Sequence, residues 1–116
     1  RKEANNMLDE VSAVVAQRAG DRVVAVVPAH MELSKPDIME AFSECVTVHE
    51  ADQVLVVPMF FARGRHINED IPRLVEHAAQ TLSNNGYNFS HRICEPLGVS
   101  NQLADLLLLR AGLLEQ

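Results

Sequence analysis

The sequence predicts an α/β domain built on a parallel sheet with helices on both faces. Its 116 residues suffice for one compact domain, 47% of them are apolar, and short apolar runs alternate with helical patterns. Strands that alternate with helices of ten or more residues pair in parallel through crossover connections. The predicted order along the chain is αβαβαβα.

The first half of the chain predicts two helices around one strand. Apolar residues recur at helical spacing over residues 3–19, and Gly20 follows as a C-terminal cap. Residues 23–27 form a continuous, largely β-branched run, typical of a strand that is buried on both faces. Ser34, with Asp37 three residues later, resembles a capping box for the second helix.

The second half repeats this alternation. Residues 53–58 carry the same buried-strand pattern, and Asn68 is a good N-cap for a third helix. Residues 87–94 predict a shorter strand, and a last helix is expected from about Ser100.

Composition narrows the possible functions. Sixteen acidic and ten basic residues give a formal charge of −6, so neither nucleic acid nor an anionic membrane is an expected partner. No apolar run approaches the roughly 20 residues of a membrane span, and no export signal opens the chain, so a cytoplasmic location is expected. Cys45 and Cys94 fit neither a CxxC motif nor a zinc spacing and are interpreted as buried thiols.

The candidate site lies in the loops that follow the predicted strands, because ligands bind beyond the carboxyl ends of parallel strands. Arg63 and Arg65 stand on either side of a glycine, and two guanidinium groups on such a loop suit bidentate binding of carboxylates. The alternative is a solvated loop whose arginines pair with Glu69 and Asp70.

Histidine and glutamate residues add metal-binding chemistry to these loops. His66 follows the two arginines, and imidazole suits both a divalent transition metal and a proton near neutral pH. His30 and Glu32 follow the preceding strand, and an imidazole and a carboxylate from adjacent strand ends can share one metal ion. The remaining histidines are interpreted as structural or surface residues: His49, His77 and His91.

Four blocks of the sequence, in order, resemble the small CbiX/SirB-type sirohydrochlorin cobalto- and ferrochelatases. They are Pro-Ala-His-Met-Glu-Leu at 28–33, Pro36 with Ala41-Phe42, the block 58–72 with its Gly-x-His and Asp-Ile-Pro, and Pro-Leu-Gly at 96–98. The resemblance implies a single chelatase-like domain over residues 1–116. It would be a three-layer α/β/α fold with a parallel sheet, four-stranded in the family and equivalent to one lobe of the larger chelatases.

The resemblance also implies an activity, the insertion of Fe²⁺ or Co²⁺ into sirohydrochlorin in siroheme or cobalamin biosynthesis. The metal is then a substrate, and no organic cofactor is expected. His66 would act as metal ligand and proton acceptor, with Glu32 as the partnering carboxylate. Arg63 and Arg65, on chemical grounds, and His30 are assigned to the substrate. A homodimer with the tetrapyrrole in a cleft is expected, and the chloroplast stroma would be the location in a plant or alga.

The chain departs from this family in two places. In the family a first strand ending in His-Gly-Ser precedes the opening helix, and its histidine is a principal metal ligand. The sequence is therefore expected to lack an N-terminal segment. The family often has a further histidine after Pro-Leu-Gly, where this chain has Val99, Ser100 and Asn101.

Two other functions remain open from the sequence. One is a carrier of tetrapyrrole or metal that has kept the fold and lost the chemistry. The other is an interaction domain that uses Met59, Phe60 and Phe61 as a dimer face.

Overall fold

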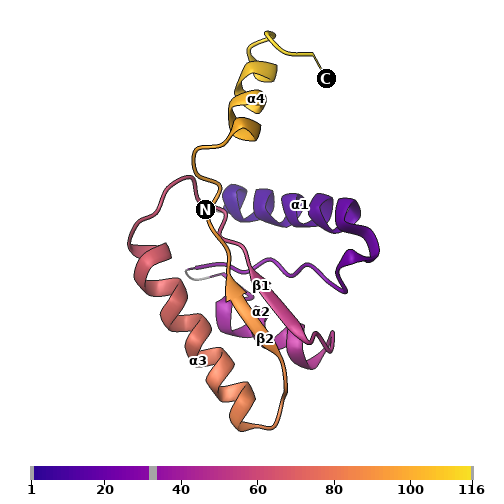
Figure 1. Ribbon diagram of the computed structural model, residues 1–116, viewed down its shortest axis with the longest axis vertical. Coiled ribbons are helices and arrows are strands. Elements are labelled where there is room, and N and C mark those ends of the chain that lie inside the picture. The colour runs from indigo at the N-terminus through magenta and orange to yellow at the C-terminus, as the bar shows by residue number, and fades with distance from the viewer. Residues whose placement is uncertain (1, 32–33, 116) are drawn as a thin grey trace.

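The computed structural model describes residues 2–31 and 34–115, with side chains from residue 6 onward. The described residues form four α-helices and two strands, and Figure 1 shows how they are arranged. The helices are α1 (Lys2–Ala19), α2 (Ile38–Thr47), α3 (Ile71–Asn84) and α4 (Asn101–Arg110), and the strands are β1 (Gln53–Val56) and β2 (Ser90–Ile93). A 3₁₀ turn (Gly20–Arg22) follows α1, and a π-helical turn (His66–Asp70) leads into α3.

The two strands form a parallel sheet that is crossed over by α3. Val54 pairs with His91 and Val56 with Ile93, and the chain between the strands passes through α3. The predicted α/β fold with a parallel sheet is confirmed. Because the strands run in parallel, their carboxyl ends and the loops that follow them lie at the same edge.

One hydrophobic core joins α2, α3 and the sheet. Phe42 of α2 is 3% exposed and Val75 of α3 is 1% exposed, and Val54 contributes from β1. The ring of Phe42 meets Phe89 and His91 edge-on, with ring centroids 5.7 and 5.6 Å apart. These contacts fix both strands against the two helices, so the loops at the carboxyl edge start from a rigid base.

Residues 23–27 differ from the prediction, because they do not form a strand. A strand needs hydrogen-bonded neighbours, and in the described part of the chain β1 and β2 pair only with each other. Val24 is 74% exposed, which a strand covered on both faces would not allow. The chain beyond this segment is anchored at His30, whose amide donates to the carbonyl of Pro36 over 3.0 Å.

The starts of α2, α3 and α4 test the helix boundaries and caps that the sequence predicts. α4 begins next to Ser100, where the last helix is expected, and Ser100 caps it by accepting from the amide of Leu103 at 3.1 Å. The second helix was assigned the wrong capping pair, because Asp37 and Glu40, and not Ser34 and Asp37, form the box. Asn68 lies inside the π-helical turn and is not an N-cap.

Helices α1 and α4 project from the core, to the right and to the top of Figure 1. Neither carries a fully buried side chain among those described. The radius of gyration is 15.6 Å, against about 13 Å for a compact domain of this length. None of the described helices combines the length and the apolarity that a bilayer span requires.

Candidate functional site

The loops after β1 and β2 are joined to each other by backbone hydrogen bonds. The amide of Cys94 donates to the carbonyl of Val56 over 2.8 Å, and that of Leu97 donates to the carbonyl of Phe60 over 2.9 Å. Gly98 adopts a φ of +61°, a conformation that side chains disfavour, beside the backbone of Phe61. The two loops therefore form one surface at the carboxyl edge of the sheet.

Arg63 is the side chain that links these loops. Its Nη2 lies 2.9 Å from each carboxylate oxygen of Glu95, and its Nη1 donates to Oδ1 of Asn68 over 3.1 Å. Glu95 belongs to the loop after β2, so the contact crosses from one loop to the other. The sequence-based alternative paired the arginines with Glu69 and Asp70, which is wrong for Arg63.

Arg65 differs from Arg63 because its guanidinium group has no bonding partner among the described residues. Its side chain is exposed, and it forms no hydrogen bond or ion pair with any described residue. A Cβ built on the intervening Gly64 would meet nothing within 4 Å, so the glycine leaves open space above the loop. The two arginines thus offer one occupied and one available guanidinium group.

His66 begins the π-helical turn and is held on two sides. Its Nδ1 lies 2.9 Å from Oδ2 of Asp70, and its ring stacks on Phe60 with centroids 5.9 Å apart and planes inclined by 29°. The side chain of His66 is 45% exposed. Its Nε2 has no hydrogen-bond partner within the described residues, so one ring nitrogen is free to meet a ligand.

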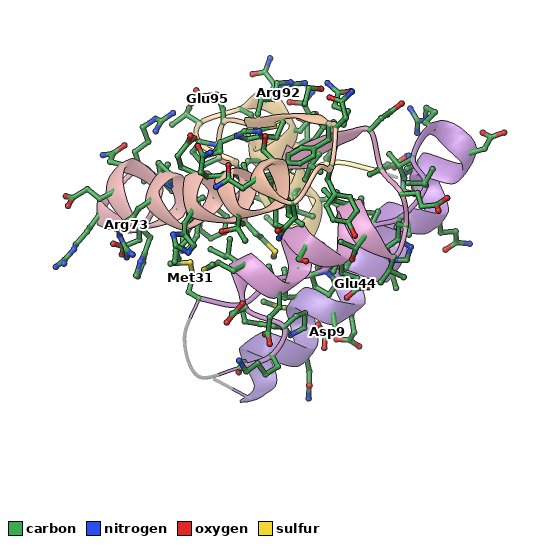
Figure 2. The ribbon with its side chains drawn as sticks, turned by 90° about the horizontal axis from the view of Figure 1, so that it is seen from below. Asp9, Met31, Glu44, Arg73, Arg92 and Glu95 are labelled. Carbon is green, nitrogen blue, oxygen red and sulfur yellow. The ribbon has the colours of Figure 1, made fainter. Side chains whose placement is uncertain are left out.

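His30 lies apart from this group. It is 6% exposed, and its Nε2 is 3.5 Å from Oδ1 of Asp9 on α1. Figure 2 places Asp9 and Glu95 on opposite sides of the view, so His30 is not brought next to Arg63. Glu32, the predicted carboxylate partner of His66, lies outside the described residues.

Among the described side chains, those of residues 6–31 and 34–115, no three of His, Cys, Asp or Glu gather closely enough to hold a metal ion. The other histidines have structural or surface surroundings. His49 pairs with Glu44 at 3.1 Å, His91 packs on Phe42, and His77 is exposed on α3.

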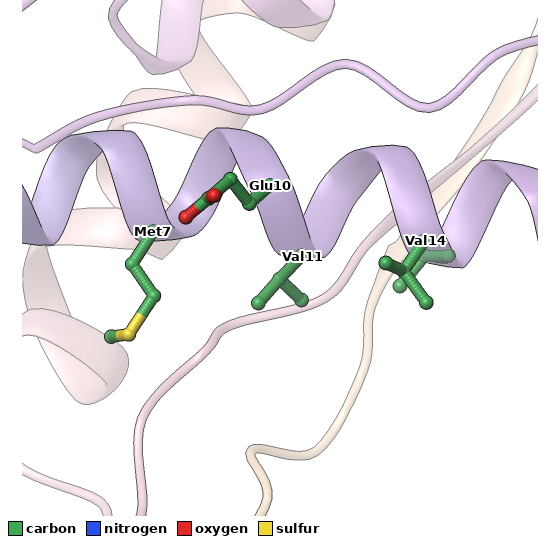
Figure 3. Close-up of a pocket in the computed structure, with 5 residues that line it drawn as sticks. Met7, Glu10, Val11 and Val14 are labelled. Atoms are coloured by element: carbon green, nitrogen blue, oxygen red, sulfur yellow. The ribbon is translucent and has the colours of Figure 1, made fainter.

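Two hollows lie away from the loops at the carboxyl edge. Figure 3 shows the first, a shallow apolar strip along α1. It is lined by Met7, Glu10, Val11, Val14 and Val15. The second lies between α2 and α3 and extends to Tyr87. Neither contains a residue predicted for the site.

Sequence reasoning gave no site role to Asp70 or Glu95. The spacing of His66 and Asp70 was an available signal, because residues four apart on a helix lie on one face. Glu95 offered no such signal, because it contacts a residue 32 positions earlier in the chain. Phe60, considered as part of a dimer face, stacks on His66 and packs against the core within the chain.

Comparison with known proteins identifies relatives over most of the chain. The chain is 41% identical over 107 residues to the chloroplastic sirohydrochlorin ferrochelatase of Arabidopsis thaliana, a match that covers 92% of this chain and 44% of that protein. It is 33% identical over 84 residues to the sirohydrochlorin cobaltochelatase of Saccharolobus solfataricus, which covers 71% and 65% of the two chains. The corresponding enzyme of Methanococcoides burtonii is 30% identical over 109 residues, with 90% and 81% covered.

The chain thus spans less than half of the Arabidopsis relative and about two thirds of the Saccharolobus one. The model of one protein family, CbiX, matches residues 1–112, which is nearly the whole sequence. This match agrees with the four sequence blocks and with the parallel sheet that carries the loops described above. The chain belongs to the CbiX family.

Proposed function

We propose that this protein is a sirohydrochlorin chelatase, a lyase that inserts a divalent metal ion into a tetrapyrrole that carries many carboxylates. The family and the names of the three relatives support this activity. The observation that carries the proposal is His66, an accessible imidazole at the carboxyl edge of the sheet with one nitrogen bonded and the other free.

Metal insertion requires the macrocycle to be held while the incoming ion replaces two pyrrole N–H protons, which pass to a nearby base. A neutral imidazole can bind a divalent ion or accept a proton, and both events require the free Nε2 of His66. In the proposal His66 and Glu32 form the metal side of the site and receive the pyrrole protons, which then pass to solvent.

The substrate side of the proposal consists of Arg63, Arg65 and His30. Arg65 is uncommitted and can bind a peripheral carboxylate directly, whereas Arg63 must first leave Glu95. His30 must likewise leave Asp9 and its buried position before it meets a ligand. We therefore assign first contact with the substrate to Arg65.

The metal is proposed to be Fe²⁺ or Co²⁺. The Arabidopsis relative is named a ferrochelatase and the two archaeal relatives cobaltochelatases, while imidazole and carboxylate ligands accept either ion.

We propose a homodimer, as in small members of this family, with light scattering in solution as the test. Cytoplasm is the proposed location, or chloroplast stroma for a plant or algal protein, as the Arabidopsis name supports.

The proposal is tested by following sirohydrochlorin absorbance under anaerobic conditions with Fe²⁺ and, separately, with Co²⁺. We expect rapid spectral change with at least one metal, and a loss of roughly 100-fold or more in rate for His66→Ala, the size typical of removing a proton acceptor. His77→Ala is the matched control, because His77 is exposed on α3 and should leave the rate unchanged.

Two results would contradict the proposal. An unchanged insertion rate in His66→Ala would remove His66 from the mechanism. Tetrapyrrole binding without insertion of either metal by the unaltered protein would make it a carrier.

A further inference from the structure

Asp70 lies where the π-helical turn passes into α3 and does not cap that helix. It immediately precedes α3, where aspartate side chains commonly accept from backbone amides, yet its carboxylate forms no such bond. Instead its Oδ2 lies 2.9 Å from Nδ1 of His66, one helical turn earlier. The side chain is thus directed to the imidazole rather than to the helix.

The turn that connects the two residues has an unusual geometry. Residues His66–Asp70 form a π-helical turn, closed by a bond from the amide of Ile71 to the carbonyl of His66. Such wide turns are rare and occur frequently at functional sites. Ile67, within the turn, is 3% exposed and packs in the core, so the turn is anchored from beneath.

Asp70 is itself held in place by its surroundings. Its side chain is 21% exposed, and Nη2 of Arg73 lies 3.8 Å from its second oxygen, Oδ1. Phe60 stacks against the face of the His66 ring. The imidazole is therefore fixed at one edge by a carboxylate and on one face by an aromatic ring.

We propose that Asp70 is the positioning residue that sets the tautomer of His66. Its carboxylate accepts the Nδ1–H of the neutral ring, so that Nε2 carries the lone pair, and this nitrogen has no hydrogen-bond partner among the described residues. A carboxylate bonded to one ring nitrogen fixes the orientation of the ring and raises the basicity of the other nitrogen. The inference rests on the proposed function of His66 and extends it to a residue that touches neither metal nor substrate.

The experiment compares Asp70→Ala and Asp70→Asn in the intact protein with Glu44→Gln as the matched control. Alanine removes the acceptor, whereas asparagine keeps the shape of the side chain but offers an N–H that can donate to Nδ1 and hold the opposite tautomer. Glu44 forms a comparable contact with His49, 3.1 Å long, in a part of the structure assigned no chemistry. Circular dichroism melts establish that each variant is folded.

The first readout is the tautomer of His66, measured by long-range ¹H–¹⁵N NMR in the metal-free protein at about pH 8, where an ordinary imidazole is neutral. We expect the Nδ1–H form in the unaltered protein and the control, a mixture of both forms in Asp70→Ala, and more of the Nε2–H form in Asp70→Asn. The second readout is the affinity for Co²⁺ alone. We expect both Asp70→Ala and Asp70→Asn to weaken it by roughly 10- to 100-fold.

Each outcome separates this inference from the proposed function. A fixed Nδ1–H tautomer that depends on Asp70, in a protein that inserts no metal, would support the positioning role and overturn the chelatase. Normal insertion by the unaltered protein, with the same His66 tautomer and Co²⁺ affinity in Asp70→Ala, would overturn the positioning role alone. If Asp70→Ala does not fold, an Nε2–H tautomer in the unaltered protein would overturn the inference.

Discussion

Arg63 and Glu95 are 32 residues apart in the sequence and form a bond in which one guanidinium nitrogen lies 2.9 Å from both carboxylate oxygens. The pair connects the loop after β1 to the loop after β2. It also means that the guanidinium group proposed to bind a substrate carboxylate already holds a carboxylate of the protein itself. Substrate must then compete with Glu95 for Arg63.

The first prediction concerns this competition. Replacing Glu95 by Gln frees Arg63, and we expect the dissociation constant for sirohydrochlorin to fall by up to about fivefold, because an exposed ion pair is worth at most about 1 kcal/mol. Arg63→Ala should raise the constant instead. Titration followed by absorbance, at low and at high salt, measures both, and the differences should shrink as salt screens the charges.

The control for this prediction is Glu76→Gln, which removes the same charge from an exposed position on α3. Net charge alone would tighten binding equally in both variants. Weaker binding in Glu95→Gln would mean that Glu95 holds Arg63 in its productive position, and the competition model would be wrong.

The second prediction tests the core that supports the loops. Phe42 is 3% exposed and contacts both Phe89 and His91. Phe42→Ala should lower the free energy of unfolding by about 3–5 kcal/mol through lost burial and the cavity that remains. Phe61→Ala, at a side chain that is 67% exposed, should change it by less than about 0.5 kcal/mol. Urea unfolding of both variants measures the difference, and similar losses would contradict the assigned core.

Local patterns predicted the elements whose stability is local. α4 begins next to Ser100, where a helix start was predicted, and residues 53–56 form a strand inside the predicted range. Residues 23–27 have an equally strong strand pattern and form none, because pairing depends on a neighbouring chain segment that the pattern itself does not contain. Sequence periodicity indicates which side chains favour burial. Whether they are buried depends on tertiary contacts with other segments of the chain.

The candidate site shows the same contrast between what local sequence patterns predict and what depends on tertiary contacts. The position of His66 and the two arginines followed from the rule that loops after parallel strands meet at one edge. The partner of Arg63 did not, since Glu95 becomes its neighbour only when β2 pairs with β1. Asp70 could have been assigned to His66 from helical spacing, but the sequence indicated it only as an alternative partner of the arginines.

The third prediction is a dependence of stability on acid pH. The backbone amide of Glu40 bonds to the carboxylate of Asp37 over 2.8 Å and lowers the pKa of Asp37, with Lys35 adding a smaller effect. A lowered folded-state pKa means that the unfolded chain binds the proton more tightly. The stabilisation is therefore complete above the unfolded pKa of about 3.9 and is lost as pH falls through the folded pKa.

Asp37→Asn isolates that effect, because asparagine also caps helices well but does not titrate. We expect the melting temperature of the unaltered protein to fall more steeply than that of Asp37→Asn below about pH 4, and the two to run parallel near neutral pH. Asp105→Asn, on the exposed surface of α4, should leave the slope unchanged. Equal slopes for all three proteins would exclude Asp37 as the source of the acid dependence.

The fourth prediction concerns the reactivity of Cys45. Both cysteines are free thiols, and burial, with a smaller contribution from the Glu44 carboxylate, raises the pKa of Cys45 above its ordinary value. Because the thiolate is the reactive form, less of it is present at any given pH. In a Cys94→Ser variant, iodoacetamide should therefore alkylate Cys45 with a pH midpoint above the usual value of about 8.5.

Unfolding supplies the control for that measurement. In concentrated urea Cys45 loses both its burial and its fixed distance from Glu44, so its alkylation should accelerate and its midpoint should return to that of a free thiol such as glutathione. Mass spectrometry of the alkylated protein follows both. If the folded protein reacted with the same midpoint as glutathione, the thiol would be solvated, and the packing of Cys45 against the core beside Val46 would have to be revised.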